Sequence, residues 1–107
     1  MSNPSVRDVL IAARKLIEKP ENWTQRAWAR DADGTVINSK NGDAVCWCSE
    51  GAIRKFSSDY FTRRSAEMAL VKAFDGMAYE TPAKFNDSLS HSAVLAAFDK
   101  AIAECGQ

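Results

Sequence analysis

Apolar side chains recur every three or four positions along four stretches of the chain, and this spacing predicts amphipathic helices. The expected helices cover residues 5–18, 44–56, 60–74 and 88–105. Ser5 and Asp8 occupy the two positions of a capping box, and Asp43 is the expected N-cap of the second helix. Asp75-Gly76 is expected to close the third helix, and one further helical turn is expected from Pro82.

Over residues 24–30 the helical period is replaced by a pattern that repeats every two residues, which predicts a β-strand. Asp33-Gly34 suits a tight turn, and residues 35–38 are the expected returning strand. Trp28 is expected to anchor this hairpin to the helices, since an isolated hairpin is only marginally stable. The order α-β-β-α-α-α predicts the α+β class: a small antiparallel β-hairpin packed on about four helices.

The composition is that of an ordinary folded domain. The chain has 107 residues, of which 46% are hydrophobic and 26% charged, so a single globular domain over residues 1–107 is expected. The formal net charge is zero, which argues against nucleic acid and anionic membranes as partners. No stretch approaches the roughly 20 apolar residues of a membrane span, and the charged N-terminal segment does not resemble a secretory signal. We expect a cytoplasmic protein with an unidentified protein or small-molecule partner.

Cys46 and Cys48 are the first candidates for chemistry. Three cysteines, an odd number, fit free thiols in a reducing compartment. Cys46 falls in the first turn of the expected second helix, where the helix dipole favours a thiolate, whereas Cys48 lies deeper on the apolar stripe. His91 is the only histidine and the candidate general base, with Asn86 or Asp87 to orient its ring. One hypothesis is therefore a cysteine-dependent hydrolase or acyl transferase that uses either thiol.

Each of these residues also has an ordinary structural interpretation. Free cysteines commonly pack as small hydrophobes, and an Asn-Asp pair before a helix is a common capping sequence. His91 falls on the apolar face of the last expected helix. A zinc site built from Cys46, Cys48, Cys105 and His91 is not expected, because Cys-x-Cys lacks the ligand spacing of structural zinc sites. The sequence therefore predicts no metal and no cofactor, and it leaves catalysis and packing as competing explanations.

Arg26, Trp28 and Arg30 are the candidate ligand-binding residues, because the alternation of two puts them on one face of the hairpin. Arginines interleaved with an aromatic ring can stack on nucleic-acid bases, and Arg63 and Arg64 could extend such a surface. The zero net charge and the lack of helix-turn-helix spacing argue against this alternative.

Four segments, taken in order, resemble a family of small bacterial and phage proteins of unknown function. They are a strand that begins with Trp at residues 23–31, a Cys-Ser-Glu-Gly-Ala-Ile helix at 48–53, a Phe-Asn-Asp element at 85–87 and an amphipathic helix at 92–104. The resemblance implies no particular activity. It singles out Cys48, Asn86 and Asp87 over Cys46.

Gly51 stands inside an expected helix, where glycine costs about 1 kcal/mol relative to alanine. Close approach of another backbone would explain the glycine. The Phe-Asn-Asp element is the expected neighbour, which would bring Cys48 near Asn86 and Asp87. The interpretation that we favour from the sequence is a small binding or accessory module without catalysis, in which these residues are structural.

Overall fold

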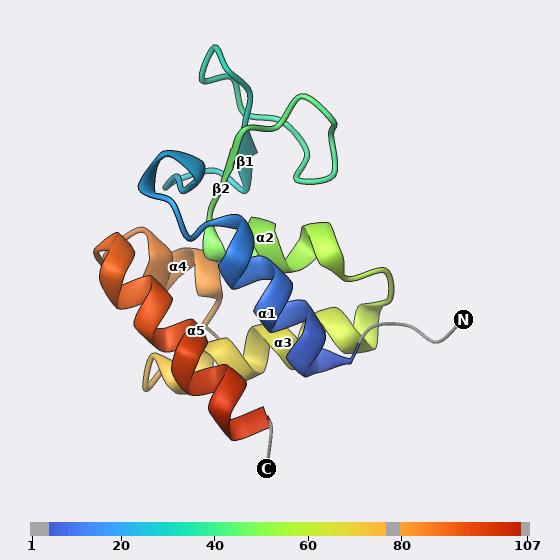
Figure 1. Ribbon diagram of the computed structural model, residues 1–107, viewed down its shortest axis with the longest axis vertical. Coiled ribbons are helices and arrows are strands. Elements are labelled where there is room, and N and C mark those ends of the chain that lie inside the picture. The colour runs from blue at the N-terminus through green and yellow to red at the C-terminus, as the bar shows by residue number, and fades with distance from the viewer. Residues whose placement is uncertain (1–4, 77–79, 106–107) are drawn as a thin grey trace.

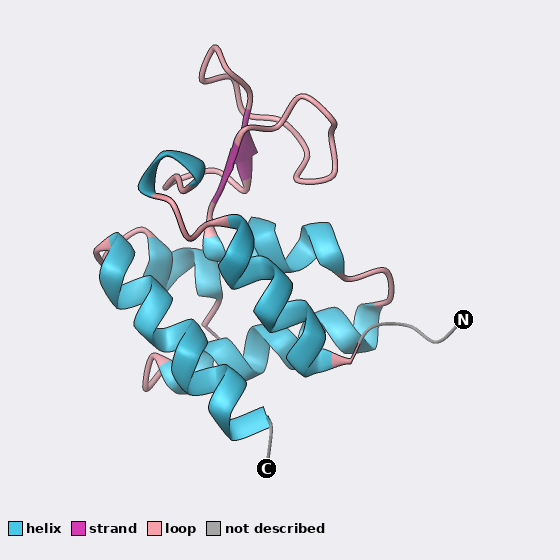
Figure 2. Ribbon diagram, viewed as in Figure 1, coloured by secondary structure: helices cyan, strands magenta, loops and turns pink. Residues whose placement is uncertain are grey.

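The structure is a computed structural model that describes residues 5–76 and 80–105. Its elements, in chain order, are α1 (Val6–Leu16), the 3-10 helix η1 (Pro20–Asn22), β1 (Ala29–Arg30), β2 (Cys46–Trp47), α2 (Ser49–Phe56), α3 (Tyr60–Ala73), α4 (Pro82–Asn86) and α5 (His91–Cys105). The α-helices gather in one body, and the two strands with their long loops project from one end of it (Figures 1 and 2). The α+β class is confirmed, and the expected turn from Pro82 is α4.

Four helices, α1, α2, α3 and α5, share a hydrophobic core. Figure 1 shows α1 across the centre of the helical body, between α5 and α2. The fully buried large apolar side chains include Leu10, Ile17, Ile53, Leu70 and Phe98. The β-ribbon, formed by β1 and β2, adds Ala29 and Trp47 to this core. Burial of each large apolar side chain stabilises the fold by about 1.5–3 kcal/mol.

The partner of the first strand differs from the expected one. β1 pairs antiparallel with β2, so that Ala29 lies opposite Trp47 and Arg30 opposite Cys46. Residues 35–38, the expected returning strand, contribute only an isolated antiparallel bridge between Val36 and Arg30. The physical reason is burial: Trp47 is 7% exposed and belongs to the core, whereas Val36 is 58% exposed. A strand register is fixed most strongly where one of its faces is buried.

The expected tight turn at Asp33-Gly34 is present. Gly34 has a φ of +85°, a left-handed conformation that glycine adopts without steric cost. Its N–H donates to the Asp31 carbonyl oxygen at 3.0 Å, and Asp31 N–H donates back to the Thr35 carbonyl oxygen at 3.0 Å. The turn therefore reverses the chain as predicted, although a longer strand does not follow it.

Helix α2 begins later than expected. Cys46 lies in β2 and not in a first helical turn, because its backbone continues the antiparallel pairing with β1. The N-cap is Cys48 and not Asp43: the Cys48 sulfur accepts a hydrogen bond from Gly51 N–H at 3.3 Å. Asp43 is exposed in the preceding loop. The helix-dipole argument for a Cys46 thiolate therefore does not apply.

Gly51 packs directly against another backbone, as expected, but the neighbour is Trp28 and not the Phe-Asn-Asp element. A Cβ atom at Gly51 would lie 2.7 Å from the Trp28 carbonyl carbon. The Trp28 carbonyl oxygen also accepts a hydrogen bond from Cys48 N–H at 3.2 Å. The Trp28 side chain remains 42% exposed, so Trp47, and not Trp28, anchors the β-ribbon in the core.

The last helices end and begin close to their expected limits. α3 ends at Ala73 with Phe74 as its C-cap, after which Asp75 adopts a φ of +60° and Gly76 N–H donates to the Val71 carbonyl oxygen at 3.0 Å. This pattern is a Schellman-type end. α5 starts at His91, and the Ser90 hydroxyl accepts a hydrogen bond from Ala93 N–H at 3.2 Å. In residues 5–76 and 80–105, no helix is long and apolar enough to cross a membrane.

Candidate functional site

Asn86 joins three separate parts of the chain. Its side chain is fully buried at the end of α4. Its Oδ1 accepts hydrogen bonds from Trp23 Nε1 at 2.6 Å and from Ser49 N–H at 3.0 Å, and its Nδ2 donates to the Thr24 carbonyl oxygen at 2.9 Å. Both polar atoms of this amide are therefore satisfied by α2 and by the segment that leads into β1.

Asp87 extends the same network. Its Oδ1 accepts a hydrogen bond from Arg26 N–H at 2.8 Å, where Arg26 adopts a φ of +63°. Gln25 Nε2 donates to the Asn86 and Leu89 carbonyl oxygens at 3.0 and 3.3 Å. The Phe-Asn-Asp element thus holds residues 23–26 in an irregular conformation, which interrupts the predicted strand before β1.

Cys48 lies next to this network, as the sequence predicted. Its side chain is 1% exposed, and it caps α2 directly before Ser49. Burial raises the pKa of the Cys48 thiol to about 11, although hydrogen bonds from the Gly51 and Glu50 N–H groups oppose this shift. Cys48 is therefore a protonated thiol at neutral pH. Cys46 is half-buried, with its sulfur 4.0 Å from the Arg30 carbonyl oxygen.

His91 has a different set of neighbours. Its Nε2 lies 2.7 Å from the carbonyl oxygen of Ile17, which can only accept a hydrogen bond, so Nε2 is the donor. Its ring packs against Trp23, with 5.3 Å between centroids. Across residues 5–76 and 80–105, no hydrogen bond joins His91 to Cys46 or Cys48. The structure thus gathers Cys48, Asn86 and Asp87, and Trp23 contacts both His91 and Asn86.

The three hairpin candidates do not share a binding face. Arg30 holds the loops, because its guanidinium donates to Thr24 Oγ1, the Gln25 carbonyl and the Gly34 carbonyl at 3.0–3.3 Å. Arg26 is exposed beside a depression of about 420 Å³ that Trp28, Ala27, Ala83 and Asp87 also line. Within the described ranges, no group of three or more His, Cys, Asp or Glu side chains could hold a metal ion.

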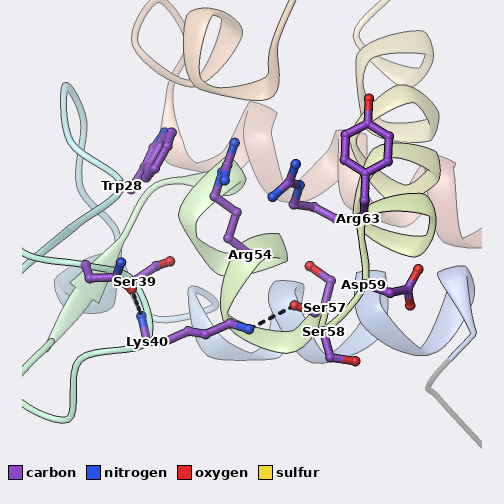
Figure 3. A pocket seen from close by; sticks show the side chains of 10 residues that line it. Trp28, Ser39, Lys40, Arg54, Ser57, Ser58, Asp59 and Arg63 are labelled. Carbon is purple, nitrogen blue, oxygen red and sulfur yellow. Dashed lines mark hydrogen bonds between the residues drawn. The ribbon is translucent and has the colours of Figure 1, made fainter.

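Trp28 also lines a second cavity, of about 230 Å³, which we call the basic pocket. It lies between the loop after β1, the end of α2 and the start of α3 (Figure 3). Its lining includes Trp28, Lys40, Arg54, Ser57, Asp59 and Arg63. Lys40, Arg54 and Arg63 are cationic and Asp59 is the one carboxylate in its lining, so the lining has a net charge of +2.

Arg54 and Arg63 are the central residues of the basic pocket. The Arg54 guanidinium stacks over the Trp28 ring at 3.9 Å from its centroid, and that of Arg63 lies 5.3 Å from the Tyr60 centroid. In Figure 3 the Arg63 guanidinium points toward Arg54. The Nε atoms of both arginines and Oε2 of Glu67 are buried and have no hydrogen-bond partner among the described residues. The Nε–H groups are thus held in place without being satisfied.

Two buried glutamates lie behind the arginines. Glu50 and Glu67 are each 5% exposed, and Arg54 Nε is 3.6 Å from the Glu50 carboxylate and 3.9 Å from that of Glu67. Arg63 Nε is also 3.9 Å from Glu67. Burial and the nearby Glu50 charge raise the pKa of Glu67, while the surrounding arginines oppose that shift. These distances are too long for hydrogen bonds, so the glutamates balance charge without saturating the arginines.

The other charged side chains of the pocket are fixed by the backbone. Lys40 Nζ donates to the Ser57 carbonyl oxygen at 3.0 Å, which holds the ammonium group at the cavity (Figure 3). Asp59 caps α3: its carboxylate accepts a hydrogen bond from Thr62 N–H at 2.8 Å, and this contact lowers its pKa. Sequence reasoning named Trp28 and Arg63 but missed Lys40 and Arg54. Neither of these two lies in a recognisable motif, and only the tertiary fold brings them to Trp28.

Comparison with known proteins identifies the family but no function. No curated protein and no solved structure matches the chain. A family model described as a family of unknown function matches residues 1–104, which is nearly the whole chain. The expected resemblance to a family of unknown function is thereby confirmed. The chain belongs to this family of unknown function, DUF6197.

Proposed function

We propose that the protein is a small cytoplasmic binding module that holds an anionic group in the basic pocket. The observation that carries this proposal is the convergence of three cationic side chains, Lys40, Arg54 and Arg63, on one cavity in whose described lining Asp59 is the one carboxylate. An anion in the cavity would accept hydrogen bonds from these cations.

The arrangement around the arginines supports this use. Stacking on Trp28 and on Tyr60 restricts where each guanidinium can lie, which lowers the entropy lost on binding. Guanidinium groups match the geometry of carboxylate and phosphate oxygens in a bidentate manner. Lys40 adds a third cation at the same cavity.

A cysteine-dependent enzyme has weaker support. A catalytic thiol needs a depressed pKa and a base within hydrogen-bonding reach. The pKa of Cys48 is raised to about 11, and the Nε2 atom of His91 faces the Ile17 carbonyl oxygen. The contacts of both residues are those of structural groups.

The proposal is tested by NMR titration of the protein with malonate and with inorganic phosphate at low ionic strength. We expect saturable shifts of the Nε–H signals of Arg54 and Arg63 and of the Trp28 indole N–H. Arg54→Gln should weaken binding by about tenfold or more, because it removes hydrogen bonds to a charged group. Arg54→Lys should restore only part of the affinity, since lysine lacks the planar fork.

Two further variants distinguish a loss of binding from a folding defect. Lys40→Gln removes a cation from the cavity and should weaken binding, and its thermal unfolding midpoint shows whether loss of the contact with the Ser57 carbonyl oxygen also lowers stability. Arg7→Gln, an exposed arginine on α1, is the matched control and should leave binding unchanged. If neither anion gives saturable shifts at the pocket, the proposed function is wrong.

A further inference from the structure

Trp28 connects two cavities of different character. The basic pocket, of about 230 Å³, is lined mainly by charged and hydroxyl side chains. The depression of about 420 Å³ that also contains Trp28 has two alanines, Ala27 and Ala83, together with Arg26 and Asp87. Trp28 therefore offers an aromatic surface to a ligand whose anionic group occupies the basic pocket, and it borders the second cavity as well.

We infer that the ligand is a mononucleotide, with its phosphate in the basic pocket and its base stacked on the part of Trp28 that Arg54 leaves uncovered. This inference rests on the proposed anion-binding function and names the chemical class of the ligand.

The phosphate half follows from the number of donors at the pocket. Lys40, Arg54 and Arg63 line it together, and the Glu50 and Glu67 carboxylates behind the arginines are too distant to accept their hydrogen bonds. Phosphate presents three acceptor oxygens, enough for both guanidinium groups and the Lys40 ammonium group.

The base half follows from the exposed ring and from Asp87. The Trp28 side chain is 42% exposed although Arg54 stacks over it. Nucleobases stack on such rings, and a loss of this contact typically weakens binding by roughly 5- to 150-fold. Asp87 Oδ1 already accepts hydrogen bonds from Arg26 N–H and Asn86 Nδ2, while its Oδ2 makes none with the described residues. Oδ2 is therefore available to accept a base amino N–H.

A longer nucleic acid fits less well. The formal net charge of the chain is zero, and the described lining of the basic pocket has three cationic side chains. Binding along a phosphate backbone needs a continuous basic surface. The acidic residues Asp59 and Asp87, one in each cavity, interrupt such a surface.

The test is a calorimetric comparison of five probes: malonate, inorganic phosphate, ribose 5-phosphate, AMP and adenosine. We expect phosphate and ribose 5-phosphate to bind with similar affinity and more tightly than malonate. AMP should bind roughly 5- to 150-fold more tightly than ribose 5-phosphate because of the stacked base. Adenosine, which lacks the phosphate, should bind much more weakly than AMP.

Two variants separate the contributions. Trp28→Leu should remove most of the AMP advantage over ribose 5-phosphate, and it keeps the backbone contact with Gly51. Asp87→Asn keeps Oδ1 for Arg26 N–H but replaces Oδ2 with a donor, so it should weaken AMP and leave ribose 5-phosphate unchanged. Arg7→Gln is again the control for a distant arginine.

The possible failures are distinguishable. If malonate and phosphate bind but AMP binds no more tightly than ribose 5-phosphate, the mononucleotide inference is overturned and the anion site stands. If an oligonucleotide binds far more tightly than AMP, the inference is likewise overturned, in favour of single-stranded nucleic acid. If none of the anions binds, the proposed function itself fails.

Discussion

Asn86 shows how one polar side chain can organise a small domain. It is fully buried, yet its amide group is matched to donors and an acceptor from two other segments, Trp23-Thr24 and Ser49. A buried amide is tolerated only when its hydrogen-bonding capacity is filled. The sequence correctly indicated that Asn86 lies near Cys48. Its pairing with Trp23 was not predictable, because 63 residues separate the two.

Asn86→Ala should lower the free energy of unfolding by at least about 1–3 kcal/mol, because it leaves the Trp23 and Ser49 N–H groups unsatisfied in the interior. Urea denaturation followed by circular dichroism measures this change. Ser88→Ala is the control, since Ser88 is exposed and its hydroxyl donates to the carbonyl oxygens of the neighbouring Lys84 and Phe85. An equal effect of both substitutions would contradict the central role of Asn86.

Cys48 should behave as a structural thiol. Because its pKa is raised to about 11 and its side chain is 1% exposed, iodoacetamide should modify it only when the protein unfolds. Cys46 and Cys105 are half-buried and should react in the folded state. Peptide mapping after a timed reaction, with and without urea, distinguishes the three thiols. Modification of Cys48 in the native protein at the rate of Cys46 would revive the nucleophile hypothesis.

At the scale of elements, helices followed the sequence pattern more closely than strands. The expected helix over residues 60–74 is α3 (Tyr60–Ala73), because side-chain periodicity and end signals are local properties. The partner of β1 is instead decided by which segment buries a face. Trp47 reaches the core and Val36 does not, and this outcome depends on helices that lie elsewhere in the sequence.

The close contact between α2 and Trp28, the residue before β1, depends on the absence of a Cβ atom at Gly51. Gly51→Ala would place a Cβ 2.7 Å from the Trp28 carbonyl carbon and closer still to its oxygen, so the backbones must separate. We expect a loss of about 1–3 kcal/mol in the free energy of unfolding, although alanine has the better helix propensity.

Gly42→Ala is the matched control for that substitution. A Cβ at Gly42 meets nothing within 4 Å, so the same chemical change should have an effect within about 0.5 kcal/mol. Thermal and urea unfolding of both variants gives the comparison. A stabilised Gly51→Ala protein would show that Trp28 moves aside at little cost, against the close packing described here.

At the scale of the whole molecule, the basic pocket explains why the candidate site was only partly predictable. Its cations come from three segments: Lys40 from a loop, Arg54 from α2 and Arg63 from α3. No local pattern relates these positions, so only the fold assembles them. Trp28 could be singled out because its motif is local, but the residue that stacks on it, Arg54, lies 26 positions further along the chain.

Although the net charge of the chain is zero, two carboxylates lie close together in the interior. Glu50 and Glu67 are both buried beside Arg54, while Arg63 and Arg64 contact Glu67 from its own helix at 3.9 and 3.8 Å. Burial is the largest influence on the pKa of Glu67 and raises it, and the Glu50 charge raises it further. The arginine charges, which lower it, do not overcome these effects.

The raised pKa of Glu67 predicts how the stability of the protein depends on pH. Because the folded-state pKa of Glu67 is raised above its ordinary value of 4.5, the folded protein binds more protons at this site than the unfolded chain as pH increases from that value. The contribution of Glu67 to stability is therefore present below pH 4.5 and is lost as pH rises through the folded-state pKa. Glu67→Gln cannot ionise at this position. Its free energy of unfolding should therefore increase relative to that of the unsubstituted protein as pH rises from 4.5 through the folded-state pKa of Glu67.

Urea midpoints of both proteins from acidic to mildly alkaline pH measure this difference. Glu104→Gln, at an exposed position on α5, controls for the general effect of removing a negative charge. The opposite slope, in which the unsubstituted protein gains stability over Glu67→Gln as pH rises, would mean that attraction by Arg54, Arg63 and Arg64 outweighs burial. In that case the arginines would be committed to Glu67, and their availability to an anion in the basic pocket would be correspondingly smaller.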